Sequence, residues 1–187
     1  MKVEASGEQV ASILNDYKVN TRADLATGRL IFGQLPIIYA RAEIISNIYQ
    51  ELYNLVGESA SAVLKRMGRS YGEKFHDLIE KEDSELFEDR QMLLQFVCAE
   101  TQAIGWGRIS IEDDGTTVTI TSPNGLVGGR IMAEKGKHPH AVDSYFLGYF
   151  ESFLSKLDGI RYESEESLCV AKGDAICMMV FRRKSKK

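Results

Sequence analysis

Cysteine, proline and tryptophan are scarce in this sequence of 187 residues, which contains three, three and one of them respectively. Three cysteines with no secretory context argue against a permanent disulfide framework. No apolar run approaches the roughly 18 residues that a membrane-spanning helix needs, and the first residues lack the apolar core of a signal peptide. We therefore expect a cytoplasmic protein with no stable membrane insertion.

An excess of positive charge is also absent. The net charge is −4 and the sequence pI is near 5.5, whereas nucleic-acid binding requires a basic face. Nucleic acid is therefore not expected as a partner. With 44% hydrophobic and 27% charged residues, the chain fits one globular domain. We divide it into an N-terminal helix and linker (1–28), a single domain (29–183) and a solvated basic tail (184–187).

Helical periodicity covers much of the chain. Apolar residues at helical spacing predict helices over residues 10–17, 44–56, 63–78, 89–103 and 140–157. Gly68 and Gly72 lie four residues apart in the third of these helices. Their missing side chains predict close approach of another backbone, because each glycine otherwise costs a helix about 1 kcal/mol. Cys98, among the apolar residues of the fourth helix, is interpreted as a core residue.

A period of two residues marks the strands. It predicts short strands at 29–32 and 37–40 and a β-hairpin over 108–121. The fold class is therefore α+β, with helices packed on an antiparallel sheet and a C-terminal metal-binding hairpin. The glycine cluster at 125–129 has neither the following lysine nor the strand-to-helix context of a phosphate-binding fingerprint. We interpret it as a mobile loop over a site.

The C-terminal stretch holds the clearest candidate for chemistry. Segments suited to strands, 167–171 and 175–181, flank a turn centred on Gly173, and this register places Cys169 directly opposite Cys177. Opposed residues share a face with Cβ atoms about 4.5–5.5 Å apart, so both sulfurs can reach one ion with Zn–S bonds of about 2.3 Å. Spacing alone leaves two alternatives open: buried side chains that bind nothing, or a cross-strand disulfide.

A tetrahedral site needs two more ligands. Nearby glutamates offer oxygen, and His138 and His140 offer nitrogen, so that two cysteines, one histidine and one carboxylate would complete it. Glu166 lies three residues before Cys169, and strand alternation places the two side chains on opposite faces. A β-bulge or a strand start near Ser167 is required to bring this carboxylate to the cysteines.

Three stretches of the sequence resemble the 4-vinyl-reductase domain family, of the archaeal stand-alone type. The pattern Glu166-x-x-Cys169-x7-Cys177 resembles its C-terminal signature, residues 64–73 (LKRMGRSYGE) its G-R-x-x-G helix, and residues 145–150 (YFLGYF) its G-x-x-G-aromatic helix. The family also includes a bacteriochlorophyll-biosynthesis protein and the sensor domains of phenol-responsive regulators. It is related in fold to TRAPP vesicle-tethering subunits and haem-based NO sensors.

The resemblance implies a structural zinc site with one departure. The sensor members add a Cys, before the penultimate helix, to the Glu and the two later Cys, and this sequence has no Cys there. His140 lies close to the equivalent place, and His138 is the fallback. The implied Zn²⁺ ligands are His140, Glu166, Cys169 and Cys177. Such a closed site would tie the final hairpin to the start of the aromatic helix instead of catalysing a reaction.

The aromatic residues suggest a binding site for a small molecule. Trp106, Phe146, Tyr149 and Phe150 are candidate walls of an apolar site between the last helix and the sheet. The sequence has no visible nucleophile–base pair and no nicotinamide or flavin fingerprint, so we favour a domain that binds or senses a small apolar or aromatic molecule over an enzyme. A reductase acting on a vinyl or tetrapyrrole substrate and a protein-interaction subunit are the alternatives. The resemblance also implies a homodimer formed through helices.

Overall fold

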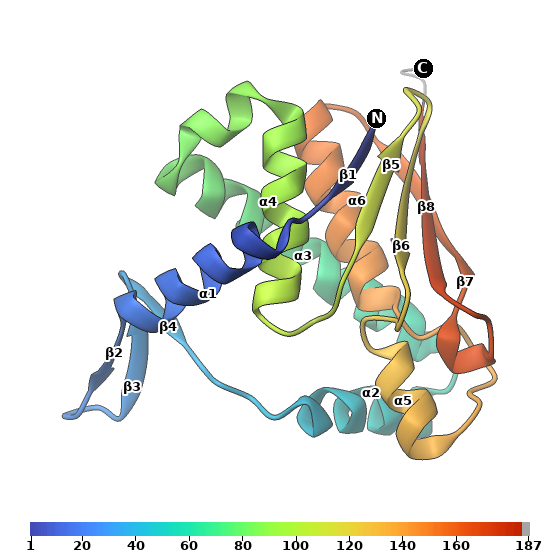
Figure 1. The fold of residues 1–187 in the computed structure, drawn as a ribbon. Coiled ribbons are helices and arrows are strands. Elements are labelled where there is room, and N and C mark those ends of the chain that lie inside the picture. The colour runs from blue at the N-terminus through green and yellow to red at the C-terminus, as the bar shows by residue number, and fades with distance from the viewer. Residues whose placement is uncertain (185–187) are drawn as a thin grey trace.

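The computed structural model describes residues 1–184; residues 185–187, which complete the predicted basic tail, lie outside the described residues. Figure 1 shows a body of helices beside a sheet, from which a long helix leads to a small second sheet. The helices are α1 (Gly7–Asn20), α2 (Ala42–Val56), α3 (Ser59–Glu82), α4 (Arg90–Ala103), α5 (Gly128–Lys135) and α6 (Ser144–Asp158). The strands are β1 (Lys2–Glu4), β2 (Thr21–Asp24), β3 (Arg29–Phe32), β4 (Leu35–Ile37), β5 (Ser110–Asp113), β6 (Thr117–Ser122), β7 (Tyr162–Leu168) and β8 (Cys177–Arg183).

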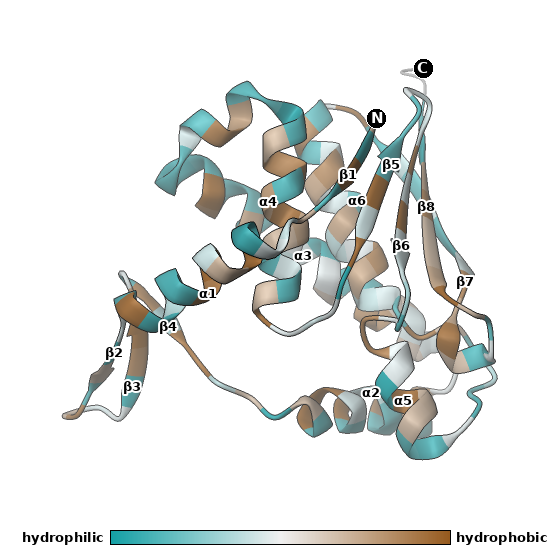
Figure 2. Cartoon of the chain, viewed as in Figure 1, coloured by the Kyte–Doolittle hydropathy of each residue, from teal (hydrophilic) through white to brown (hydrophobic). Residues whose placement is uncertain are grey.

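The main sheet has five strands in the order β1-β5-β6-β8-β7, and each neighbouring pair is antiparallel. Strand β6 alternates as the sequence predicts, since Val118 and Ile120 are fully buried and the threonines on either side of them are half-buried. Phe150 of α6 meets Phe181 of β8 with ring centroids 6.4 Å apart, so the core lies between α6 and the sheet. The hydrophilic strand β7 forms one edge (Figure 2). The α+β class is confirmed.

Helices α3 and α6 cross at very short distance, as the glycine pair in α3 predicts. A Cβ atom on Gly68 would lie 1.8 Å from the carbonyl oxygen of Tyr145, and one on Gly72 would lie 2.2 Å from that of Tyr149. Gly148 of α6 makes the reciprocal approach, 2.0 Å from the carbonyl oxygen of Lys65. Only glycine allows backbones to come this close. The contact fixes α6, the helix that borders both candidate sites.

Two local predictions are corrected, and one strand was missed. The glycine cluster at 125–129 is a turn that leads into a helix and not a loop throughout, because its last two residues begin helix α5. The strand predicted at 37–40 is instead β4, three residues centred on Pro36 at the edge of the small sheet. Proline has no backbone N–H to donate, and an edge strand tolerates this because one of its sides has no partner strand. Strand β1 was not predicted, and it joins the edge of the main sheet by pairing with β5. The division of the chain at residue 28 stays a prediction.

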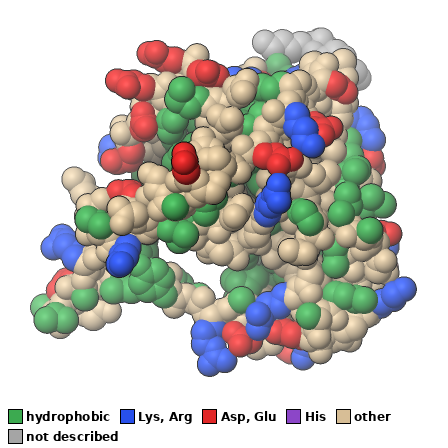
Figure 3. Space-filling view, viewed as in Figure 1, with side chains coloured by type: hydrophobic (Ala, Val, Ile, Leu, Met, Phe, Trp, Pro, Cys, Tyr) green, Lys and Arg blue, Asp and Glu red, His purple; other side chains and the backbone are tan. Residues whose placement is uncertain are grey.

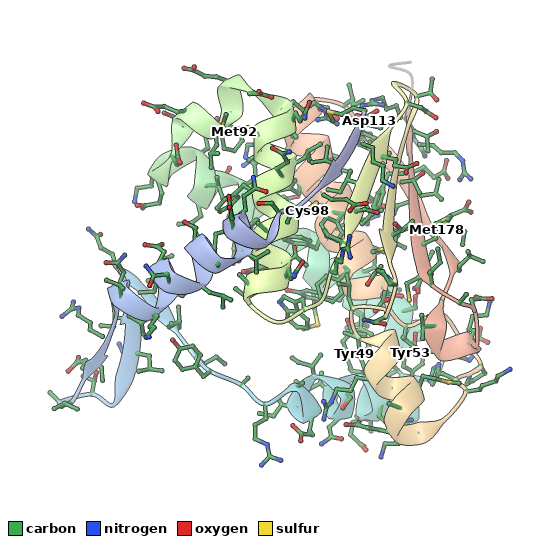
Figure 4. The ribbon with its side chains drawn as sticks, viewed as in Figure 1. Tyr49, Tyr53, Met92, Cys98, Asp113 and Met178 are labelled. Carbon is green, nitrogen blue, oxygen red and sulfur yellow. The ribbon has the colours of Figure 1, made fainter. Side chains whose placement is uncertain are left out.

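Cys98 is fully buried in the core, as predicted. The apolar stripe predicted for residues 44–56 behaves differently, because the buried residues of α2 are Ser46 and Tyr49 while Ile44 and Ile48 are exposed. Figure 4 shows Tyr49 and Tyr53 on α2, beside α5. Among residues 1–184, no helix is both long enough and apolar enough to cross a membrane.

Candidate metal centre and apolar cavity

A β-bulge in the last hairpin brings a carboxylate onto the face of the two cysteines. Glu166 of β7 pairs with Met179 of β8, but Leu168 pairs with Met178, so Ser167 is an extra residue. Met179 is fully buried, and its partner therefore belongs to the inner face. The bulge that the spacing of Glu166 and Cys169 requires is thus present.

The connection between the two strands is longer than the predicted three-residue turn. Strand β7 ends at Leu168 and β8 begins at Cys177, and a short 3-10 turn (Val170–Lys172) lies between them. The backbone N–H of Cys169 donates to Oδ2 of Asp174 at 2.8 Å, and that of Val170 donates to Sγ of Cys177 at 3.2 Å. The turn forms because these hydrogen bonds replace the strand ladder and hold both sulfurs in place.

Three of the four predicted ligands lie together. One ligand atom each of Glu166, Cys169 and Cys177 lies within 4.8 Å of the others, and both cysteines are fully buried and free. Two thiols and a carboxylate are a donor set suited to Zn²⁺. The Cys177 thiol donates toward Cys169, which lowers the pKa of Cys169 and raises that of Cys177. Burial, reinforced by the charge of Asp143, raises the pKa of Glu166 to about 10.

The structure does not bring His140 into this group. Its Nε2 lies 3.8 Å from the carboxylate of Glu58, and its ring stacks on Tyr53 at a centroid distance of 5.9 Å. His138 is also outside the group, and its Nδ1 accepts a hydrogen bond from the backbone N–H of His140 at 3.2 Å. The assignment of a histidine as the fourth ligand stays a prediction.

Sequence reasoning missed Asp143, which lies immediately before α6 and is fully buried. Its side chain does not cap its own helix. Instead Oδ1 accepts hydrogen bonds from the backbone N–H groups of Val127 (2.9 Å) and Gly128 (3.3 Å), where α5 begins. Its backbone N–H donates to Oε2 of Glu166 at 2.9 Å. An aspartate before a helix is normally a local cap, so the sequence contained no signal for this long-range role.

The glycine cluster at 125–129 packs directly over the sulfurs. A Cβ atom on Gly125 would lie 3.0 Å from Sγ of Cys177, and one on Gly128 would lie 3.5 Å from Sγ of Cys169. Gly125 also has a φ of +69°, which favours glycine. The prediction that this segment covers a site therefore agrees with its position, although it is a turn and a helix start.

A cavity of about 80 Å³ lies among helices α3, α4 and α6 and the segment after α4. It does not lie between α6 and the sheet as predicted, because none of its lining residues belongs to a strand. Its lining residues are Tyr71, Glu100, Thr101, Ile104, Trp106, Tyr145, Phe146 and Tyr149. Three of the four predicted wall residues are among them, and Trp106 meets Phe146 edge to face with centroids 4.8 Å apart. Phe150 is not a lining residue, because it points into the core against Phe181.

Glu100 is the unexpected member of the cavity wall. The residue is only 5% exposed, and this burial raises the pKa of its carboxyl to about 7. The hydroxyl of Tyr17, on α1, donates to Oε1 over a long 3.4 Å. Sequence reasoning missed this residue, since a single glutamate among the apolar residues of a helix has no recognisable pattern.

No protein-family model matches the sequence, and no curated protein matches it. Solved structures do. The phenol-responsive sensory domain of the transcription activator PoxR has a TM-score of 0.73 and 19% identity, covering 93% of this chain and 90% of that one. A trafficking protein particle complex subunit 3 from Naegleria fowleri, covalently bound to palmitic acid, has a TM-score of 0.59 and 14% identity, covering 77% and 95%.

A vinyl-4-reductase family protein from Methanocaldococcus jannaschii has a TM-score of 0.53 and 10% identity, covering 94% of each chain. At these identities the likeness concerns the fold alone. The chain therefore has the fold shared by these sensory, trafficking and vinyl-4-reductase proteins. The fold relation that the three sequence stretches predict is confirmed.

Proposed function

We propose that this chain is a domain that binds or senses a small aromatic molecule, with the ligand in the cavity beside α6. The observation that carries the proposal is the cavity itself, which combines aromatic walls with one buried carboxyl group. Small-molecule sites are typically apolar and contain few polar groups, which fix the orientation of the ligand. The PoxR sensory domain, which has the same fold and is described with phenol, supports this proposal.

The size of the cavity limits the ligand. Sites for drug-sized molecules have volumes of about 300–1,000 Å³, and an engineered apolar cavity of about 150 Å³ binds benzene. At about 80 Å³, this cavity suits a single ring, and only after small movements of its walls. A tetrapyrrole is far too large, so the cavity does not favour the alternative of a reductase acting on such a substrate.

Glu100 suggests what the ring carries. A buried carboxyl group costs free energy unless it is hydrogen-bonded, and its contact with Tyr17 is long at 3.4 Å. A ligand with an O–H or N–H group would supply the missing partner. We therefore propose a phenol or an aromatic amine as the ligand class.

A structural Zn²⁺ would tie the hairpin to the rest of the domain. Glu166, Cys169 and Cys177 fit such an ion, because both cysteines are free and buried and Oε1 of Glu166 has no partner within residues 1–184. The sequence places His140 as the fourth ligand. When bound, the ion would cross-link the segments that carry its four protein ligands. It would have no open coordination position at which a substrate could react. Helix α6 connects the two regions, since it begins beside the cluster and its Phe146 and Tyr149 line the cavity.

Direct binding measurements can test the ligand. Trp106 is the single tryptophan of the chain and lines the cavity, so its fluorescence should report a bound ring. We expect phenol to change this emission saturably, and Glu100→Gln to weaken binding about tenfold, or about 1.4 kcal/mol, because an amide oxygen accepts a weaker hydrogen bond than a carboxylate oxygen does. Met92→Ala, an exposed residue on the same helix (Figure 4), is the matched control.

Native mass spectrometry of freshly purified protein, with extraction of any bound molecule, completes this test. A co-purified aromatic compound would support the proposal. A bound flavin or nicotinamide, or emission that no single-ring compound alters, would refute it.

We also propose a homodimer formed through helices. Val63, Met67 and Tyr71 follow one another at four-residue spacing on α3 and are 41%, 48% and 47% exposed. Exposed apolar stripes of this kind mark interaction surfaces. Met67→Glu places a charge in the stripe and should shift the mass measured by light scattering from two chains to one. Met92→Glu, equally exposed on α4, should leave the mass unchanged, and a wild-type monomer at micromolar concentration would exclude the dimer.

A further inference from the structure

Two buried carboxylates beside the sulfur pair each have one oxygen without a partner. Oδ2 of Asp143 and Oε1 of Glu166 are inaccessible to solvent and accept no hydrogen bond within residues 1–184. Their other oxygens are occupied, since Oδ1 of Asp143 accepts from Val127 and Gly128 and Oε2 of Glu166 accepts from Asp143. Buried polar atoms are nearly always paired, so two orphans at one place indicate a missing partner.

Two other acids with little exposed side chain have cations beside them, although the buried Glu100 of the cavity wall has none among residues 1–184. Glu151 pairs with Lys65 at 2.9 Å and with Arg69, and Asp113 pairs with Arg90 at 2.8 Å. The ion pairs of the described residues include neither Asp143 nor Glu166. The cluster therefore gathers acids and thiols without a positive charge. A cation from solution is the partner that this chemistry requires.

Asp143 is in contact with the cluster, whereas His140 is not. The backbone N–H of Asp143 donates to Oε2 of Glu166 at 2.9 Å, and the charge of its side chain acts on Cys169, Cys177 and Glu166. The imidazole of His140 is 39% exposed and lies beside Glu58. Asp143 is outside the set whose ligand atoms are all within 4.8 Å of one another, so an ion must draw its carboxylate inward.

We infer that Asp143, and not His140, is the fourth ligand of a divalent-cation site completed by Glu166, Cys169 and Cys177. The inference rests on the proposed metal site and changes its chemistry. The donor set becomes two oxygens and two sulfurs instead of one oxygen, one nitrogen and two sulfurs. Four anionic ligands suit a borderline-soft divalent ion in tetrahedral geometry, such as Zn²⁺ or Co²⁺. The site also joins α5, through the Asp143 hydrogen bonds, to the final hairpin.

Cobalt substitution tests the fourth ligand by spectroscopy. Full-length protein is stripped of metal and titrated with Co²⁺ under reducing, anaerobic conditions, and the absorption of thiolate-to-cobalt charge transfer is measured per bound ion. Asp143→Cys should raise this absorption by about half, because three thiolates replace two. His140→Cys should leave it unchanged. Asp143→Asn keeps an oxygen for Val127 and Gly128 but should weaken Co²⁺ binding more than about 100-fold, beyond the usual effect of an outer-shell change.

The outcomes separate this inference from the metal site itself. If wild-type protein shows two-thiolate absorption and His140→Cys, not Asp143→Cys, adds the third thiolate, the fourth ligand is His140 and the inference is wrong. If neither variant adds a thiolate and His140→Ala and Asp143→Asn both bind Co²⁺ as wild type does, water or another residue is the ligand and the inference is again wrong. If wild-type protein binds no Co²⁺ with thiolate absorption, the proposed metal site fails with it. Thermal unfolding of each variant shows that its fold is intact.

Discussion

The cysteine cluster and the aromatic cavity both bury acid groups, but their surroundings differ. Glu100 lies in the wall of a cavity, next to aromatic rings and with a single long hydrogen bond. Asp143 and Glu166 instead accept hydrogen bonds from backbone N–H groups, and a carboxylate oxygen of Glu166 lies within 4.8 Å of both sulfurs. The difference teaches that burial alone does not identify the missing partner. Space beside an acid indicates a molecule, and sulfur beside an acid indicates an ion.

Removing the sulfurs should produce the largest effect. We expect the double variant Cys169→Ser, Cys177→Ser to lose the metal that wild-type protein contains, measured by elemental analysis of protein purified without a His-tag. The stability that a bound ion adds, about 4 kcal/mol at 1,000 times its dissociation constant, should be lost as well. Cys98→Ser changes an equally buried cysteine of α4 and should keep the metal. If the double variant contains as much metal as wild-type protein, the two cysteines do not bind it and the cluster is not a metal site.

The pH dependence of stability should distinguish Glu100. Its folded pKa of about 7 lies above the ordinary value of 4.5, so the folded state binds more protons between these pH values. Stability therefore falls as the pH rises from about 4.5 to 7, by about 3 kcal/mol in total. Glu100→Gln removes this loss, and urea unfolding at pH 5 and pH 8 should show a smaller difference than in wild-type protein. Glu112→Gln, an exposed change of the same kind, is the control; an unchanged slope in Glu100→Gln would contradict the argument.

Changing Gly148 tests the helix that the two regions share. The Cβ atom of Gly148→Ala would lie 2.0 Å from the carbonyl oxygen of Lys65, so α6 must move away from α3. We expect a loss of about 1–3 kcal/mol in the free energy of unfolding. Gly7→Ala, where nothing lies within 4 Å, should be nearly neutral. If Gly148→Ala is equally neutral, the close helix crossing does not fix α6.

Local patterns were sufficient for those parts of the site that lie within one hairpin. The face of each strand residue follows from counting, which is why the bulge near Ser167 could be predicted from the spacing of Glu166 and Cys169. The glycine pair of α3 was likewise visible in the sequence. The length of the turn was not, because it depends on the side chain of Asp174 bonding back to Cys169.

The residues that were missed act across the fold. Asp143 reaches Glu166 over 23 positions, and Glu100 meets Tyr17 over 83. Neither distance leaves a periodic signal, and both residues have an ordinary local explanation, one as a cap and the other as a polar position on a helix. On α2 the sequence predicted a buried apolar face, but Ile44 and Ile48 are exposed. Helical periodicity identifies an apolar face without showing which element covers it.

The bulge at Ser167 has a consequence for comparing relatives of this chain. Deleting Ser167 would shorten the interval between the glutamate and the first cysteine from three to two, and residues two apart on a regular strand share a face. The carboxylate would therefore stay beside the sulfurs, whereas straightening the bulge without a deletion would turn it away, because strand register has a period of two. A relative with an interval of two and no bulge can therefore hold the same centre, and a search for a fixed interval of three would overlook it.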